Sequence, residues 1–179
     1  MKVAFHGTDL PEGKVKYNDP VVAALVEKFQ PAKVTPYYFE FLAGLDRSAE
    51  ATVIASNALL DLLILDMDRI ETRLDRTGDS AEQAVLRRAL EALEAETPLC
   101  DVELDDASRA CLRALDPESL KPTLVLDGAS PADTDRVCEQ VLEKSGRMFF
   151  YTAGKQEVHA WLVDCGAAAV DCAERIHSD

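Results

Sequence analysis

The chain has 179 residues, of which 47% are hydrophobic and 29% charged, which suits a single globular domain with or without an appendage. Its formal net charge of −14 argues against a nucleic-acid partner, because such binding relies on Lys and Arg side chains at phosphate groups. The longest apolar run, residues 21–26, is far too short to cross a membrane.

The first part of the chain is predicted to alternate strands with one helix. Residues 2–7 form a short strand that ends at a glycine. Asp19, followed by a proline, predicts a helix start, because an N-cap residue precedes proline at the first helical position; Pro31 ends this helix. Residues 34–42 are rich in Tyr and Phe and predict a strand, and Pro36 near its start is typical of a sheet edge.

The middle of the chain is predicted to be helical. Residues 48–75 carry apolar side chains at spacings of three, four or seven, which predicts one helix of about 40 Å. Ser80 and Gln83 match a capping box that starts a second helix, and Pro98 closes it. These two helices are expected to form an antiparallel hairpin, with a third short helix over about 106–115.

Strands and helices alternate again toward the C-terminus. Residues 122–127 predict a buried strand, and Ser130 and Pro131 with Asp133 cap a helix that runs to about Lys144. Residues 148–153 and 157–163 predict a hairpin, followed by a short helix. We therefore predict an α/β fold: a small mixed sheet flanked by helices, an inserted antiparallel helical hairpin, and a C-terminal β-hairpin plus helix.

The cysteines and the start of the chain bear on its location. The five cysteines are an odd number and contain no C-x-x-C pair, so we expect thiols rather than a disulfide framework. No charged and then apolar leader of the signal-peptide type opens the chain. We expect a cytoplasmic protein.

The order of residues at the C-terminus is more specific than its hairpin pattern. It contains Tyr-Thr-Ala-Gly from Tyr151, Glu-Val-His-Ala-Trp ending at Trp161, then Gly166, and Ile-His-Ser-Asp at 176–179. This order resembles the start of the TGS domain in the Obg-like ATPases, the YchF family of P-loop NTPases, which has Phe-Thr-Ala-Gly, Glu-Val-Arg-Ala-Trp, a glycine and Ile-His-Thr-Asp. The resemblance implies a partial, half-TGS-like segment at 148–179.

Three further stretches are similar to the same family. Residues 13–41 resemble the stretch that leads to the Walker B strand, residues 66–74 resemble the inserted coiled coil, and residues 120–122 resemble the lead into the base-recognition loop. The resemblance implies a shortened, degenerate relative. It also implies a division into a remnant of a P-loop-type domain at 1–47 and 118–147, an inserted helical hairpin at 48–117, and the TGS-like segment.

The phosphate-binding loop of that family is degenerate in this sequence. A P-loop needs backbone amides that cradle the phosphates, a Lys that reaches them and a hydroxyl for Mg²⁺. The nearest string runs from Gly7 to Gly13 and Lys14, and its spacer is one residue too long. It also contains Pro11, which has no N–H, and Val15 replaces the hydroxyl residue.

The metal and base contacts of the family are also missing. Ala43 and Gly44 follow the strand where the family has the Walker B aspartate, and Gly128 and Pro131 stand where the family reads the base. The arginine of the family's Glu-Val-Arg-Ala-Trp is His159 in this chain. Three requirements of nucleotide hydrolysis therefore fail together, and we expect neither hydrolysis nor a bound cofactor.

Three hypotheses follow from these residues. The first is a non-hydrolysing relative that acts as a protein-binding or regulatory module, with a protein partner or a second copy of the chain. Its candidate partner surface is the apolar stripe Leu63, Met67, Ile70 and Leu74, although the simplest interpretation of that stripe is the hairpin's own core. The second is weak binding of a purine nucleotide, GTP or ATP with Mg²⁺, at a vestigial site formed by Gly7, Gly13 and Lys14. The third is an enzyme that uses Cys and His in an unrelated site.

The cysteines and histidines have ordinary roles as well as metal binding open to them. Cys165, Cys172 and His177 could converge on zinc, but Cys172 and His177 are five residues apart and do not share one helix face. His6 ends a predicted strand, where a packed or partly exposed histidine is the simpler interpretation. We expect no metal site and name no catalytic residue.

Overall fold

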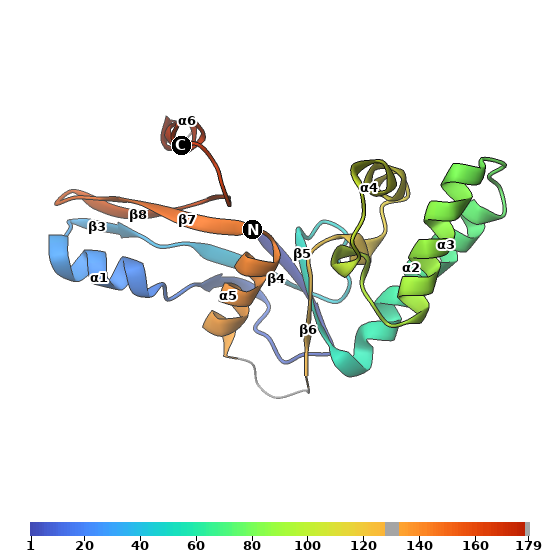
Figure 1. The fold of residues 1–179 in the computed structure, drawn as a ribbon. Helices are drawn as coiled ribbons and strands as arrows, with labels where there is room; N and C mark the ends of the chain where they lie inside the picture. The colour runs from blue at the N-terminus through green and yellow to red at the C-terminus, as the bar shows by residue number, and fades with distance from the viewer. Residues whose placement is uncertain (128–132, 178–179) are drawn as a thin grey trace. The chain divides into compact units, whose positions relative to one another are not determined.

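The computed structural model describes residues 1–127 and 133–177, and the chain packs as two compact units (Figure 1). Unit 1 consists of Met1, Leu10–Phe41 and Ala132–Asp179. Unit 2 consists of Lys2–Asp9 and Leu42–Pro131. The strands belong to two sheets with helices against them, so the predicted α/β class is confirmed. The division by descent into a P-loop remnant, an insertion and a TGS-like segment stays a prediction.

Unit 2 is built on three parallel strands. β1 (Lys2–His6) pairs with β5 (Ala51–Ala55), and β5 pairs with β6 (Thr123–Leu126). All five residues of β5 are buried, as expected for a parallel strand that is covered on both faces. The strand therefore forms the centre of this unit.

The predicted helix over 48–75 is wrong in its first part. Residues 51–55 form β5, Ser56–Ala58 form a 3₁₀ turn (η1), and helix α2 spans Leu59–Leu74. A short run such as Ala-Thr-Val-Ile-Ala carries no alternation that separates a buried strand from a helix. Its pairing with β1 and β6, which are distant in sequence, selects the strand.

The predicted helical hairpin is confirmed. Helix α2 packs side by side with α3 (Ser80–Glu94), and α3 contacts α4 (Asp106–Arg113) (Figure 1). Two further 3₁₀ turns, η2 (Leu99–Asp101) and η3 (Glu118–Leu120), complete the unit. The core contains the buried apolar residues Ile54, Leu59, Leu62, Leu63, Ile70, Leu86, Ala89, Leu90, Leu93, Leu99 and Leu112.

The start of α3 differs by one residue from the predicted capping box. Asp79, rather than Ser80, is the N-cap, and its carboxylate accepts a hydrogen bond from the Ala81 N–H at 2.9 Å. The Gln83 side chain bonds to the Thr77 carbonyl instead of reaching back to the cap. An aspartate accepts from the first free N–H groups as well as serine does, so the neighbouring residue takes the cap.

Unit 1 contains an antiparallel pair and a separate three-stranded sheet. β2 (Gly13–Lys16) pairs with β4 (Tyr38–Ala43). In the second sheet β8 (Glu157–Asp164) lies between β3 (Lys33–Thr35), to which it is parallel, and β7 (Arg147–Ala153), to which it is antiparallel. The C-terminal hairpin thus pairs with another strand of the chain, which stabilises it because an isolated two-stranded hairpin is marginal in water.

The strand predicted over 34–42 is two strands. β3 ends at Thr35 and β4 begins at Tyr38, and the two belong to different sheets. Pro36 has no N–H for a ladder, so the chain leaves one sheet at this residue and enters the other. The proline therefore breaks the predicted strand, and β3, the part before it, lies at the edge of its sheet.

Three helices belong to unit 1: α1 (Pro20–Phe29), α5 (Thr134–Lys144) and α6 (Ala169–His177). The predicted start of α1 is confirmed, since the Asp19 carboxylate accepts from the Val21 N–H at 2.8 Å. Helix α1 lies along one face of the β3–β8–β7 sheet, where Val22 packs on Val158 and Ala160 (Figure 1). Of the residues predicted to cap α5, Ser130 and Pro131 lie outside the described residues, and Asp133 is the N-cap, accepting from the Asp135 N–H at 3.1 Å.

No helix in the described ranges 1–127 and 133–177 is long and apolar enough to span a membrane.

Candidate functional site

Gly7 follows β1 and packs tightly within unit 2. Its φ of +70° is in the left-handed region that favours glycine. A Cβ at this position would lie 2.7 Å from the Ala58 Cβ and 3.1 Å from the Ala55 Cβ. Glycine is thus required here by the backbone conformation and by the close approach of the segment after β5.

Gly13 and Lys14 lie in a strand rather than in a phosphate-binding loop. They belong to β2, where Gly13 is paired with Phe41 and Lys14 with Glu40. The next helix begins only at Pro20. A P-loop needs a helix N-terminus directly behind its glycines, because that end directs N–H groups and a positive dipole at the phosphates. Gly7 belongs to unit 2 and the other two residues to unit 1.

Substitution of the two glycines should distinguish the tight packing at Gly7 from the effect of a positive φ alone at Gly13. Gly7→Ala adds a clash to a strained backbone, so we expect the free energy of unfolding to fall by about 2 kcal/mol. Gly13→Ala has open space around its Cβ, and we expect a loss of about 1 kcal/mol from its φ of +100° alone. Urea denaturation followed by circular dichroism measures both. Equal effects of the two substitutions would contradict this account of Gly7.

The region of the missing Walker B aspartate forms a turn. β4 ends at Ala43, and Gly44, with φ of +85°, forms an isolated bridge to Phe5. Asp46, the nearest carboxylate, accepts a hydrogen bond from the Ser48 N–H at 2.8 Å. The hydrogen bonds from Ser48 lower the pKa of Asp46 below its usual value. This carboxylate is therefore held by its own turn. The proposed base-reading positions, Gly128 and Pro131, lie outside the described residues.

His6 has an acidic partner that the sequence did not indicate. Its Nε2 lies 2.9 Å from Oδ2 of Asp61 in the first turn of α2. The His6 side chain is 36% exposed and that of Asp61 is 63% exposed. Such an exposed pair contributes little to stability. The histidine is thus partly exposed and paired, in line with the simpler interpretation.

Asp66 is the centre of a buried polar network in unit 2. Its side chain is fully buried and accepts from the Glu118 N–H at 2.8 Å and from the Ser119 N–H at 2.7 Å. Nη1 of Arg69 lies 3.4 Å from Oδ1 of Asp66. Burial raises the pKa of Asp66, while the hydrogen bonds from Ser119 and Glu118 act in the opposite direction. The carboxylate therefore holds the η3 turn against α2.

The apolar stripe predicted as a partner surface lies in the core instead. Leu63 and Ile70 have no exposed surface, and Met67 and Leu74 are partly buried against the same cluster. These side chains face α3 and the turns that cover it, so they stabilise the hairpin. The exposed apolar residues of α2 are Leu60, Ile64 and Leu65, which sequence spacing alone did not distinguish from the core.

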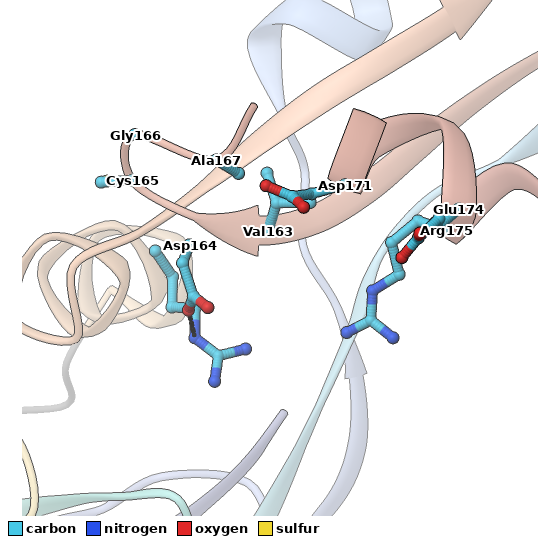
Figure 2. Close-up of a pocket in the computed structure, with 9 residues that line it drawn as sticks. Val163, Asp164, Cys165, Gly166, Ala167, Asp171, Glu174 and Arg175 are labelled. Carbon is cyan, nitrogen blue, oxygen red and sulfur yellow. Dashed lines mark ion pairs between the residues drawn. The ribbon is translucent and has the colours of Figure 1, made fainter. Parts of the chain in front are cut away.

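Unit 1 has a polar pocket of about 560 Å³ beside the end of β8 (Figure 2). It is lined by Arg147, Val163, Asp164, Cys165, Gly166, Ala167, Asp171, Glu174 and Arg175. Asp164 forms an ion pair with Arg147 at 2.7 Å, and Asp171 accepts from the Ala168 N–H at 2.8 Å. Asp164 and Asp171 are therefore engaged in holding the turn and the start of α6.

Two tyrosines share a buried acidic environment in unit 1. The Tyr151 hydroxyl donates to Oδ2 of Asp19 at 2.6 Å, and the Tyr17 hydroxyl donates to Oε1 of Glu139 at 3.2 Å. Burial and these carboxylates raise the pKa of both phenols well above the usual value. Both hydroxyls thus remain protonated donors, and they join α1, β7 and α5 rather than supply a base.

The five cysteines are thiols that differ in burial. All five lie in the described part of the chain and none is in a disulfide. In residues 1–127 and 133–177 no three His, Cys, Asp or Glu side chains are placed to hold a metal ion. Cys165 is exposed, whereas Cys138 is fully buried and burial raises its pKa to about 12.

The thiols should therefore differ in reactivity in the folded protein. We expect Cys165 to react rapidly with a chromogenic disulfide reagent at neutral pH, because it is exposed. Cys138 should react only after unfolding, even in mildly alkaline buffer, because its thiolate is not formed. Mass spectrometry of the labelled peptides distinguishes the two. Rapid labelling of Cys138 in the folded protein would contradict the buried position.

Three comparisons with known proteins show what this chain is similar to. A family model named YchF-GTPase_C, described as "Protein of unknown function (DUF933)", matches residues 148–179. The "Ribosome-binding ATPase YchF" of Bacillus subtilis (strain 168) is 24% identical over 185 residues, covering 67% of this chain and 50% of that protein. The chain thus spans about half the length of this curated relative.

A solved structure supports the same fold. The YchF GTPase of Schizosaccharomyces pombe matches with a TM-score of 0.71 and 14% identity, covering 100% of this chain and 84% of that one. The fold, the matched C-terminal segment and the curated relative agree with one another. The chain is a relative of the YchF, or Obg-like ATPase, family.

Proposed function

We propose that this chain is a non-hydrolysing relative of the YchF ATPases that acts as a protein-binding or regulatory module. One observation carries the proposal: the segment in place of a phosphate-binding loop continues from Gly13 as strand β2, with no helix until Pro20. The amides of an extended strand point alternately to its two sides, half of them toward β4, so they do not converge on one phosphate. Neither a triphosphate nor Mg²⁺ is held in this proposal.

The residues near Lys14 support the same conclusion. Lys14 stands across the ladder from Glu40, which offers its charge a partner on the same face. The carboxylate nearest the Walker B position, Asp46, is occupied by its turn. Among the described residues, Lys14 therefore lies in a strand and Asp46 in a turn, and neither is placed in a phosphate-binding loop.

The exposed face of α2 is the surface that we propose for the partner. Leu60 and Ile64 are 48% and 52% exposed and are one helical turn apart, and Asp61 and Asp68 lie on the same exposed side. Apolar side chains with an acidic rim suit a protein segment that carries apolar and basic residues. This surface replaces the buried stripe predicted from the sequence.

Hydrolysis assays test the first part of the proposal. We expect phosphate release from ATP or GTP with Mg²⁺ to stay at the level of a protein-free blank. Lys14→Ala, which leaves the β2–β4 backbone pairing intact, should behave as the unmodified chain. Turnover that Lys14→Ala abolishes would refute the proposal and would favour the vestigial nucleotide site.

Affinity capture from extracts of the source cells tests the second part. The double variant Leu60→Lys/Ile64→Lys should lose a partner that the unmodified chain retains, while Val170→Lys, an exposed apolar position on α6, should retain it. Both variants should keep the helical circular dichroism of the unmodified chain. Retention of every partner by the double variant would exclude this face as the binding surface.

A further inference from the structure

β7 is an edge strand with one open side. The sheet order is β3–β8–β7, and within the part of the chain that the structure describes β8 is the strand that pairs with β7. An edge strand directs N–H and C=O groups away from its sheet, where another strand can pair with them. The two edge strands of this sheet differ in how strongly their sequences oppose pairing with another strand.

β3 carries features that oppose the addition of another strand, and the described residues of β7 lack them. β3 has three residues, begins with Lys33 and is followed closely by Pro36, all of which oppose the addition of a strand. β7 has seven residues and no proline, and residues 148–153 carry no charge. Its sequence, Arg-Met-Phe-Phe-Tyr-Thr-Ala, is rich in strand-forming residues.

Hydrogen bonds at both ends of the hairpin fix which residues face the open edge. The Cys165 N–H donates to the Gly146 carbonyl at 2.7 Å, and the Gly154 N–H donates to the Glu157 carbonyl at 3.0 Å. Antiparallel ladders alternate between residues that bond to one neighbour and residues that bond to the other. The even-numbered residues of β7 therefore bond to β8.

Phe149 and Tyr151 are then the residues whose backbone groups point outward. Their side chains pack on the α1 side of the sheet, beside Tyr17 and Tyr37. On the opposite face, Phe150 stacks on Trp161 with ring centroids 6.1 Å apart. The next residue on that face, Met148, is 46% exposed.

We propose that a second copy of this chain pairs with β7, antiparallel and centred on Phe150. In this register Phe149 of one copy forms a hydrogen-bonded pair with Tyr151 of the other, and the reverse pair forms by symmetry. Phe150 lies opposite Phe150 of the second copy, and the exposed Met148 lies opposite Thr152. The two three-stranded sheets become one continuous sheet.

The properties of the strand favour its own copy as the occupant. The register centred on Phe150 uses the whole seven-residue strand, so both copies present the same groups to each other. The positions that meet on the outer face are Met148, Phe150 and Thr152, which are uncharged and place no like charges in opposition. The net charge of −14 opposes association at a distance, so added salt should strengthen the dimer.

A charge-complementation experiment tests the register directly. Phe150→Lys and Phe150→Glu each place like charges opposite one another at the two-fold axis, so sedimentation velocity should show a dimer dissociation constant at least about tenfold weaker for either variant alone. An equimolar mixture of the two variants should recover the dimer, because Lys then faces Glu. A folding defect would not be repaired by mixing.

Two controls separate this inference from the proposed function, on which it does not depend. Val21→Lys alters an exposed apolar residue of α1 away from β7 and should leave the dimer unchanged. The α2 variant Leu60→Lys/Ile64→Lys should also remain dimeric. A monomeric unmodified chain, or charge variants that remain dimeric when measured alone, would overturn the proposal. Variants that weaken the dimer but fail to recover it on mixing would also overturn it.

Discussion

Replacing Asp66 with alanine should lower the free energy of unfolding by about 3 kcal/mol. The change leaves the N–H groups of Glu118 and Ser119 buried without their acceptor, and each unsatisfied group costs about 1–3 kcal/mol. The loss is smaller than the sum because a buried carboxylate is itself costly, as its raised pKa indicates. Urea denaturation of the purified chain measures the difference.

A neighbouring carboxylate provides the control for this result. Asp68 lies on the exposed side of the same helix, and Asp68→Ala should change the free energy of unfolding by less than about 0.5 kcal/mol. If both substitutions have the same small effect, Asp66 does not hold the η3 turn in solution.

The contribution of Asp66 to the free energy of unfolding should depend on pH in a definite direction. Because the pKa of Asp66 is raised in the folded state, the folded chain retains this proton to higher pH than the unfolded chain. The linked stability is fully present below the usual carboxyl pKa and is lost as pH rises through the raised value. The free energy of unfolding of the Asp66→Asn variant should therefore lack the fall that Asp66 causes as pH rises through its raised pKa.

Replacing Ile70 with alanine should be the most destabilising change on α2, with a loss of about 3–4 kcal/mol. Ile70 is fully buried in the core shared by α2 and α3, and removal of a large buried side chain costs the transfer free energy and leaves a cavity. Leu60→Ala, at a position that is 48% exposed, should cost less than about 0.5 kcal/mol.

This pair of substitutions separates the core of the hairpin from its proposed binding face. Thermal and urea unfolding should rank Ile70→Ala far below Leu60→Ala in stability. Capture of a protein partner should be weakened more by Leu60→Ala than by Ile70→Ala, once the stability of each variant is taken into account. A stable Ile70→Ala chain would mean that the stripe is not the core and would restore it as a surface.

The sequence predicted the elements that local signals define. Asp19 before a proline located the start of α1, and the three- and four-residue spacing located the helices of the hairpin. The order of residues after Tyr151 pointed to the family that the C-terminal match supports. In each case the signal lies within a few residues of the feature that it predicts.

The errors arose where distant segments decide the structure. β5 is a strand because β1 and β6 flank it, and residues 51–55 alone do not separate a strand from a helix. Asp66 bonds to residues 52 and 53 positions away, and His6 meets a carboxylate 55 positions away. The close approach of Gly7 to the segment after β5 likewise cannot be predicted from the residues that neighbour Gly7 in the sequence.

The central proposal is that this chain, a relative of the YchF ATPases, does not hold a nucleotide. Isothermal titration calorimetry with ATP and with GTP, each with Mg²⁺, measures this most directly, with a nucleotide-binding YchF protein as the positive control. We predict no saturable heat for either nucleotide with this chain. Saturable binding in the micromolar range, weakened by Lys14→Ala, would contradict the claim.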